Sequence, residues 1–315
     1  MKVTSILITD YVHEFLIENL INDGFKVDYF PDITLVEVKE IINNYEGIVI
    51  NTKIPIDKEM MDLGARLKVI VRLGSGLEIV DLNYAKEKGI IVKNTPEGNR
   101  NAVGEHALGM LLALMNNIVI ANNEVKEFNW EREKNRGNEL EGKTIGIIGF
   151  GNTGSAFAKL LSGFDIKILA YDKYKQRFAS EFRNTIETDL KEIFEESDIV
   201  SFHVPLTKET YHMGNTDFFK SFNKDVFVIN TSRGKVIKTE DLIENLSTKK
   251  IKGAAIDVFE NEHPSTYTDD EKLMYSNLLS MENVVATPHI AGWTKESKFK
   301  IGKLTYTSLI GVLKV

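Results

Sequence analysis

Short apolar runs rich in β-branched residues alternate along the chain with longer amphipathic stretches. Such runs predict β-strands, and strands separated by helical stretches predict βαβ units with parallel sheets. Several runs are apolar at consecutive positions, which is typical of strands covered by helices on both faces. Ten strands are predicted in this way, at residues 5–9, 47–51, 68–72, 90–93, 144–149, 166–171, 198–203, 226–230, 253–258 and 284–287.

A long apolar segment from Asn101 to about Phe128 separates the first four predicted strands from the last six. Apolar residues such as Val103, Ala107 and Met110 recur in it at helical spacing, and Asn101 is a suitable N-cap. Ten strands are many for one sheet. We therefore predict an α/β protein of two domains joined by this helix.

The composition narrows the class of protein. The chain has 315 residues, of which 43% are hydrophobic and 27% charged, the balance of a globular protein with about two domains. It contains no cysteine, which excludes disulfides, thiolate metal sites and a cysteine nucleophile. His13, His203 and His212 have no ligand-like spacing with any acid, so no metal site is expected.

The net charge of −7 comes without any basic block, which argues against a nucleic-acid partner because phosphate neutralisation needs clustered Lys and Arg. The longest apolar stretch, residues 107–115, is far shorter than the roughly 20 residues that span a bilayer. The N-terminus has no signal-peptide pattern. We expect a soluble, cytoplasmic protein with no membrane partner.

The strand predicted at residues 144–149 leads into the sequence Gly149-Phe-Gly151-Asn-Thr-Gly154 and then into a helix. Glycines at this spacing allow a tight turn, a close approach of the backbone to a pyrophosphate, and close packing of helix on strand. Asp172 ends the next strand, 23 residues after Gly149, where an acid can bind the ribose hydroxyls of a dinucleotide. The loop residues expected to contact the cofactor are Gly149, Gly151, Asn152, Thr153 and Gly154.

An acid at position 172 also repels a 2′-phosphate, so the predicted cofactor is NAD rather than NADP. Lys173 and Lys175 lie beside it and weaken that preference.

Ligands of open α/β sheets bind outside the carboxyl ends of the strands. Arg233, Glu262 and His289 each follow a predicted strand in the second half of the chain. These polar residues are therefore the candidates to contact a ligand at that edge.

In these stretches the sequence resembles the D-isomer-specific 2-hydroxyacid dehydrogenase family, and the resemblance covers essentially the whole chain. The motifs that carry it are Asn-Thr-Ser-Arg233-Gly, Asp257-Val-Phe with Glu262 five residues after the Asp, and Thr-Pro-His289-Ile. The resemblance implies that Arg233 binds the carboxylate and carbonyl oxygen of the substrate, that His289 is the general acid and base, and that Glu262 hydrogen-bonds His289. His263 stands where the family usually has Pro directly after the Glu.

The implied chemistry is consistent with these side chains. Hydride transfer to a 2-keto group leaves an alkoxide that needs a proton, and imidazole titrates closest to neutral pH. A carboxylate partner such as Glu262 favours the charged imidazolium form of His289. Arg233 can present paired N–H donors to a carboxylate, which a lysine cannot.

The resemblance extends the expected site. The loop after the strand at 68–72 looks like the family's substrate-carboxylate loop, where backbone N–H groups bind the anion. Lys53 and Arg72 could meet a phosphate. The residues implied for the substrate are Lys53, Arg72, Gly74, Ser75 and Gly76. The further residues implied for the cofactor are Pro205, Thr231, Asp257 and Gly292, with Asp257 on the nicotinamide amide. Glu105 and His106 are assigned to packing or capping.

The resemblance also implies two doubly wound parallel-sheet domains with the active site between them. One is a flavodoxin-like substrate domain of residues 1–98 plus 291–315, and the other is a Rossmann NAD-binding domain of residues 99–290. The implied assembly is a homodimer, with residues 101–130 as the arm.

Within the family the chain resembles short 3-phosphoglycerate dehydrogenases most, although Asn51 stands where such enzymes often carry an arginine. Reduction of glyoxylate or hydroxypyruvate, and D-lactate-type activity, remain open. A binding protein of another class, an NAD-sensing corepressor, shares the fold and motifs. Glu262 argues against a formate dehydrogenase, whose histidine partner is a glutamine, and a methyltransferase would have no use for the Arg–Glu–His set.

Overall fold

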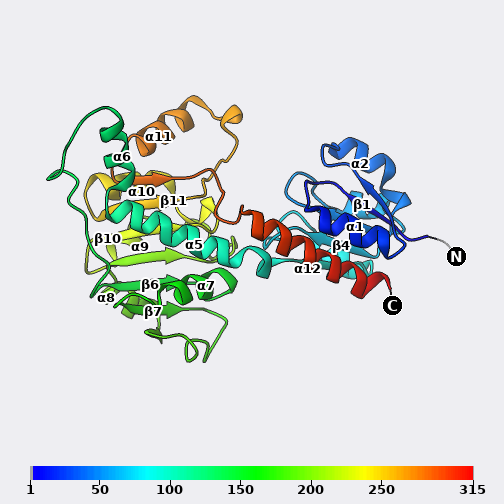
Figure 1. Cartoon of the computed structure of the whole chain (residues 1–315), viewed down its shortest axis with the longest axis horizontal. Coiled ribbons are helices and arrows are strands. Elements are labelled where there is room, and N and C mark those ends of the chain that lie inside the picture. Colours follow the sequence, from blue (N-terminus) through cyan, green and yellow to red (C-terminus); the bar gives the residue numbers. More distant parts are fainter. Residues whose placement is uncertain (1–2, 315) are drawn as a thin grey trace. The chain divides into compact units, whose positions relative to one another are not determined.

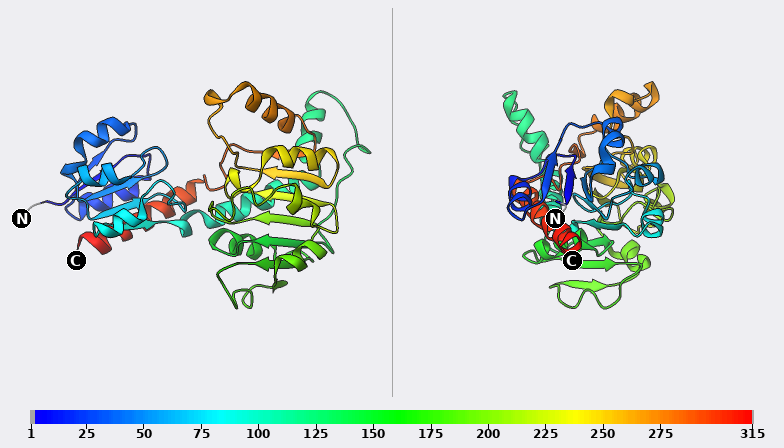
Figure 2. Two further views of the ribbon diagram at one scale, coloured as in Figure 1. Left: turned by 180° about the vertical axis from the view of Figure 1, so that it is seen from behind. Right: turned by 90° about the vertical axis from the view of Figure 1, so that its right-hand side faces the viewer.

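The computed structural model describes residues 3–314, which divide into two compact units. Of the described residues, 3–100 and 293–314 form the first unit, and Asn101–Gly292 form the second. Each is an α/β unit built on one parallel sheet (Figures 1 and 2). The predicted fold class is confirmed.

The first unit has a five-stranded sheet in the order β2-β1-β3-β4-β5, which is the flavodoxin-like order. Its strands are β1 (Ser5–Ile8), β2 (Lys26–Tyr29), β3 (Gly47–Ile50), β4 (Val69–Arg72) and β5 (Ile91–Asn94). Its helices are α1 (Glu14–Asn22), α2 (Leu35–Ile41), η1 (Ile42–Asn44), α3 (Lys58–Leu63), α4 (Leu82–Glu87) and α12 (Lys295–Leu313). Helix α12 returns from the end of the chain and packs beside α1, where Leu309 is fully buried (Figure 1).

The second unit has a seven-stranded sheet in the order β12-β11-β10-β9-β6-β7-β8, the doubly wound Rossmann order with one more strand. Its strands are β6 (Thr144–Ile148), β7 (Lys167–Tyr171), β8 (Thr185–Glu187), β9 (Ile199–Phe202), β10 (Val226–Asn230), β11 (Ile251–Ile256) and β12 (Val284–Ala286). Its helices are α6 (Ile118–Lys126), α7 (Asn152–Leu161), α8 (Leu190–Glu196), α9 (Thr216–Lys220), η2 (Gly234–Val236), α10 (Thr239–Ser247), η3 (Pro264–Thr266) and α11 (Asp269–Leu279). Helix α5 (Pro96–Met115) enters it from the first unit.

Successive residues of the central strands face two separate cores. Ile145 and Ile147 of β6 pack in one cluster, and Ile148 packs in another with Val200 of β9. The same alternation divides the first unit into two clusters. This arrangement explains why the strands read as unbroken apolar runs, since both faces are covered.

All ten predicted strands are found, with their ends within two residues of the prediction, but β2 and β8 were missed. Both lie at an edge of their sheet. Neither Lys26-Val-Asp-Tyr29 of β2 nor Thr185-Ile-Glu187 of β8 has two apolar residues in succession, so neither carries the apolar run that marked the others.

The predicted single helix after Asn101 is wrong in two respects. Helix α5 begins at Pro96, five residues earlier, because proline is well suited to the first position of a helix. The segment is also broken after Met115, and α6 is bent by 63° from α5. Asn117 at the break has a φ of 53°, a left-handed conformation that asparagine tolerates better than most residues.

Within residues 3–314, no single helix is both long and apolar enough to cross a membrane; only the bent pair α5 and α6 taken together meets those criteria by length and composition. Ala107 and Leu111 of α5 are fully buried in the core of the second unit.

Candidate active site

Arg233 is held in a tight turn that follows β10. Asn230, the last residue of that strand, accepts hydrogen bonds from the Ser232 backbone N–H (3.0 Å) and hydroxyl (2.7 Å), and its amide donates to the Arg233 carbonyl at 3.0 Å. A Cβ on Gly234 would lie 1.9 Å from the Phe259 carbonyl, so only glycine fits. The turn that carries Arg233 therefore lies against the loop that carries Glu262.

His289 and Glu262 form a hydrogen-bonded pair, with 2.7 Å between Nδ1 and Oε2. Nδ1 therefore carries the proton that faces the carboxylate, which leaves Nε2 for proton exchange with a ligand. The imidazole side chain is 46% exposed and the carboxylate 35%. The φ of His289 is 55°, an unusual value for a residue other than glycine. Its backbone N–H holds it there by donating to the carbonyl of Asp257 at 2.7 Å.

The side chain of Asp257 holds the segment around His289 in place. Its side chain is fully buried and accepts hydrogen bonds from Thr287 Oγ1 at 2.5 Å and from the backbone N–H groups of Ile290 and Ala291, both at 2.9 Å. His106 Nε2 lies 3.6 Å away and 3.0 Å from Thr287 Oγ1. Burial raises the pKa of this carboxyl, but the nearby His106 and the hydrogen bonds from Thr287, Ala291 and Ile290 outweigh burial and lower the pKa overall.

The structure therefore shows Asp257 as an anchor of the His289 segment, a role that the sequence did not reveal. Its predicted contact with the nicotinamide amide stays a prediction. His106, which we assigned to packing or capping, is joined to the same segment. The adjacent Glu105-His106 pair was visible in the sequence, but nothing in its spacing pointed to Thr287.

One cavity of about 820 Å³ brings the three predicted catalytic residues together, since Arg233, Glu262 and His289 all line it. The basic and imidazole groups that face the pair from the other walls are Arg233, Lys235, Lys238, His212 and His263. The acidic and phenolic groups there are Glu240, Glu260, Glu271 and Tyr275. A second cavity of about 430 Å³, lined by Phe259, Tyr267 and Tyr275 among others, shares Glu262 and His289.

The glycine loop fits the phosphates of a dinucleotide. Gly149 has a φ of 92°, and a Cβ on it would lie 2.5 Å from the carbonyl oxygen of His203. A Cβ on Gly154 would lie 2.1 Å from the Gly149 oxygen. Around Gly151 there is open space, and no side chain caps helix α7, whose first residues are Asn152 and Thr153. An open backbone at an uncapped helix N-terminus is what a pyrophosphate requires.

Besides the glycine loop, the side chain of Thr231 also indicates a binding site for the cofactor. It follows β10 directly, it is buried, and its hydroxyl has no hydrogen-bond partner among the described residues. A buried hydroxyl without a partner costs free energy unless a ligand satisfies it. Of the other predicted cofactor residues, Pro205 lies in the loop after β9, where its carbonyl accepts from Thr210 Oγ1 at 2.6 Å, and Gly292 ends the second unit.

The Asp172 carboxylate is hydrogen-bonded to backbone groups of the glycine loop and of the turn after β7. Its carboxylate accepts from the backbone N–H groups of Phe150 (2.9 Å), Tyr174 (2.9 Å) and Lys175 (3.1 Å). A carboxylate has about four acceptor positions, so about one remains for a ribose hydroxyl. Lys175 Nζ bonds the Phe150 carbonyl at 2.9 Å, and Lys173 pairs with Glu209 at 2.6 Å. Both lysines that could have favoured a 2′-phosphate are thus already engaged.

His203 was missed as a functional residue. Its ring is buried, with Nε2 2.8 Å from Ser201 Oγ and Nδ1 3.3 Å from Thr153 Oγ1 at the start of α7. Burial lowers its pKa to about 3, so the ring is neutral at physiological pH. His203 thus links the end of β9 to the glycine loop. A lone histidine carries no spacing signal that would have found this contact.

In the first unit, Arg72 ends β4 and leads into the predicted substrate loop. The Gly74 N–H donates to Thr95 Oγ1 at 2.8 Å, and the contact of this loop with a substrate anion stays a prediction. The Ser75 carbonyl accepts from the Asn94 amide at 2.6 Å, while Gly76 follows it in the loop. Lys53 is exposed, and its ammonium group bonds the carbonyl of Pro31. Its contact with a phosphate stays a prediction.

In the part of the chain that the structure describes, no group of three or more His, Cys, Asp or Glu side chains is arranged to hold a metal ion.

A Rossmann unit with a fitting glycine loop, beside a cavity lined by Arg, Glu and His, defines a nicotinamide-dependent dehydrogenase. The model for the NAD-binding domain of D-isomer-specific 2-hydroxyacid dehydrogenases matches residues 108–291. The chain belongs to this family, and NAD is its cofactor.

Several relatives have different substrates in their names. The chain is 40% identical over 267 residues to hydroxypyruvate reductase of Thermotoga maritima, which covers 84% of each chain. It is 33% identical over 309 residues to D-3-phosphoglycerate dehydrogenase of Archaeoglobus fulgidus, covering 98% of this chain but only 57% of that relative. Among solved structures, D-lactate dehydrogenase of Aquifex aeolicus in complex with NAD and lactic acid aligns with a TM-score of 0.86 at 29% identity, covering 99% and 96% of the two chains.

Removing the Thr231 hydroxyl tests its assignment to the cofactor. We expect Thr231→Val to weaken NADH binding by up to about 10-fold, the worth of one hydrogen bond, while the stability of the free protein stays the same or rises. Fluorescence titration with NADH and urea unfolding measure the two effects. Thr305→Val is the matched control, because Thr305 Oγ1 is also buried without a partner among the described residues but lies in the first unit. Equal NADH affinity in wild type and Thr231→Val would sink the assignment.

Burial of His203 predicts a pH dependence of stability. Its pKa is about 3 in the folded state and 6.5 as the ordinary value, so the unfolded chain binds the extra proton between these pH values. The free energy of unfolding should therefore fall by about 1.4 kcal/mol per pH unit as the pH drops below 6.5, from this residue alone. In urea unfolding at pH 7.5, 5.5 and 4.5, His203→Gln should show a correspondingly shallower slope. His263→Gln, an exposed control, should keep the wild-type slope.

Proposed function

We propose that the chain transfers a hydride reversibly between NAD and C2 of a D-2-hydroxy acid or its 2-keto acid, with 3-phosphoglycerate and 3-phosphohydroxypyruvate as the substrate pair. The observation that carries the proposed reaction is the His289–Glu262 pair, 2.7 Å apart, in one cavity with Arg233. The chain spans 57% of the length of the phosphoglycerate dehydrogenase relative, so the activity of that whole protein is not transferred with the likeness.

NADH supplies the hydride that adds to C2 in the direction of reduction. Arg233 binds the substrate carboxylate through paired N–H donors and so fixes the orientation of the neighbouring carbonyl. The protonated His289 donates the Nε2 proton to the carbonyl oxygen as that oxygen gains electrons, which yields the hydroxyl group. Glu262 holds the imidazole by Nδ1 and favours its charged form between turnovers. In oxidation the same nitrogen takes the hydroxyl proton.

The group on C3 distinguishes the candidate substrates. The positive charges of Lys53 and Arg72 favour a substrate that carries a phosphate on C3. Asn51 argues against such a substrate, because it is neutral where 3-phosphoglycerate dehydrogenases often carry an arginine. Hydroxypyruvate, or the related glyoxylate, is the second candidate, because the hydroxypyruvate reductase relative has the higher identity and is covered over most of its length. A D-lactate-type activity is supported by the structural likeness alone.

Oxidation of NADH at 340 nm tests the substrate directly, with 3-phosphohydroxypyruvate, hydroxypyruvate, glyoxylate, pyruvate and 2-ketoisocaproate compared at equal concentration. We expect the highest kcat/KM with 3-phosphohydroxypyruvate. A preference for hydroxypyruvate or glyoxylate would replace the proposed substrate with the second candidate. Failure to turn over any of them, with NADH bound, would favour the NAD-sensing binding protein instead.

Substitution of the pair tests the mechanism. His289→Asn should lose about 10²- to 10⁴-fold in kcat, the usual contribution of a general acid, with NADH affinity unchanged. Glu262→Gln should move the alkaline limb of the kcat/KM profile to lower pH, because an amide does not stabilise the imidazolium form. Measurement of kcat/KM from about pH 5 to about pH 10 locates this alkaline limb. Near-normal activity of His289→Asn would contradict the mechanism.

We also infer a homodimer formed through α6 and the segment that follows it. Apolar side chains are exposed there, with Phe128 at 95% and Trp130 at 76%, and Ile118, Val119 and Val125 of α6 are also exposed. Large apolar groups gathered on a surface mark contacts with another chain. Light scattering should give a dimer for the wild type and a monomer for Phe128→Ser/Trp130→Ser. Tyr174→Ser, which removes another exposed aromatic ring, should remain dimeric, and a monomeric wild type would end the proposal.

A further inference from the structure

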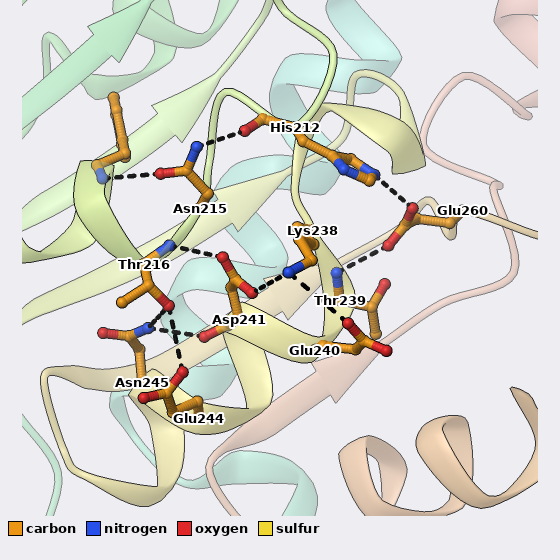
Figure 3. Close-up of polar contacts among 11 residues, drawn as sticks. His212, Asn215, Thr216, Lys238, Thr239, Glu240, Asp241, Glu244, Asn245 and Glu260 are labelled. Carbon is orange, nitrogen blue, oxygen red and sulfur yellow. Dashed lines mark hydrogen bonds and ion pairs between the residues drawn. The ribbon is translucent and has the colours of Figure 1, made fainter. Parts of the chain in front are cut away.

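A second histidine–carboxylate pair lines the cavity that holds His289 and Glu262. His212 Nε2 lies 2.7 Å from Glu260 Oε2 (Figure 3). Glu260 stands two residues before Glu262 on the same loop. The two side chains are 24% and 21% exposed, so this pair is more enclosed than the His289–Glu262 pair.

His212 is a fixed point rather than a mobile surface side chain. Its backbone N–H donates to the Lys235 carbonyl at 2.8 Å, and its carbonyl accepts from the Asn215 amide at 3.0 Å. Its φ of 51° is in the left-handed region, and its ring stacks on Tyr211 with 4.0 Å between centroids. A backbone held in an unusual conformation by two hydrogen bonds keeps the imidazole in one place.

The other oxygen of Glu260 is bound to a different segment. Oε1 accepts from the backbone N–H of Thr239, the first residue of α10, at 2.8 Å. That end of the helix is itself fastened, because Lys238 pairs with Asp241 at 2.7 Å and Asp241 accepts from the Thr216 N–H at 2.9 Å (Figure 3). One carboxylate thus connects the loop after β11 to two rigid neighbours.

Glu262 has much weaker support of its own. Besides His289, its carboxylate accepts only a long hydrogen bond, 3.4 Å, from the Phe259 N–H among the contacts found in residues 3–314. Asn261 fixes the backbone from the far side, where its N–H donates to Tyr275 Oη at 2.9 Å and its carbonyl accepts from Tyr267 Oη at 3.1 Å. The place of Glu262 therefore depends on its neighbours in the loop.

We infer that Glu260, held by His212 and Thr239, is a positioning residue that keeps Glu262 in contact with His289. The inference rests on the proposed function, in which Glu262 favours the charged form of His289. When Glu260 loses one of its two bonds, the loop can move, the Glu262–His289 contact weakens, and the imidazolium form is less favoured.

The experiment compares pH profiles of kcat/KM for the wild type, Glu260→Gln, Glu262→Gln and the double variant, each with NADH and its best 2-keto acid. The glutamine at 260 has one acceptor oxygen, so it cannot accept from both the Thr239 N–H and a His212 Nε2–H. We expect Glu260→Gln to move the alkaline limb to lower pH, in the same direction as Glu262→Gln but by less, and to lower kcat by about 3- to 10-fold, as one lost hydrogen bond would. In the Glu262→Gln background, Glu260→Gln should cause no further shift of the limb.

Two further variants keep the test decisive. His212→Asn retains a residue that tolerates the left-handed backbone but is too short to reach Glu260, so it should shift the limb as Glu260→Gln does. Glu244→Gln, an exposed acid of the same network outside the cavity, should leave the limb in place. None of these variants alters Arg233, Lys235, Lys238, Glu240, His263 or Glu271 around the cavity, so a shift can be assigned to the altered contact.

The outcomes separate the inference from the proposed function. If Glu262→Gln leaves the limb unmoved, the role proposed for Glu262 is wrong. If Glu262→Gln moves the limb but Glu260→Gln and His212→Asn do not, the inference is overturned. A uniform loss of kcat at every pH, equal in both backgrounds, would show that Glu260 has only a structural effect and would equally overturn it.

Discussion

The buried carboxylate of Asp257 is the constraint on which the candidate site depends. It sits at the end of β11 with no exposure to solvent, and the chain supplies every hydrogen bond that its oxygens are found to receive. A buried charge without partners would be very costly, so the segment 287–291 has to close over it with its N–H groups pointing inward. That closure forces His289 into a left-handed backbone conformation and aims its ring outward. The stability of the fold and the orientation of the proposed acid thus come from one set of contacts.

The conformation of the glycine loop is also fixed by contacts within the protein, and here the main constraint is steric. Gly149 and Gly154 cannot carry a side chain because backbone oxygens occupy the space, and Gly151 leaves its surroundings open. The buried, neutral ring of His203 then joins this loop to the neighbouring strand. The loop that must accept a charged pyrophosphate is therefore held by steric constraints and by an uncharged ring, in addition to the contacts of Asp172 and Lys175 with Phe150.

The sequence predicted those parts of the structure whose physical cause is local. Ten strands could be recognised because each contains a run of apolar residues, and the site motifs because each follows a strand end. The edge strands β2 and β8 were missed because polar and apolar residues alternate in them, and the break at Asn117 was missed because helical spacing continues on either side of it. The contacts of Asp257 with His106 and of Glu260 with His212 join residues far apart in sequence, and no spacing rule reports such distances. The family resemblance supplied Arg233, Glu262 and His289, yet it gave no information on what holds them in place.

The hydrogen bonds of Asp172 have a consequence for changing cofactor preference. An acid that only repelled a 2′-phosphate could be exchanged for a neutral residue at little cost. Here the same carboxylate gathers three backbone N–H groups and closes the turn between the glycine loop and the end of β7. Its removal would release the turn itself, while Lys173 and Lys175 would still be occupied by Glu209 and the Phe150 carbonyl. Dinucleotide choice in this chain is thus a property of loop architecture, and an exchange of one charge would not by itself redirect it.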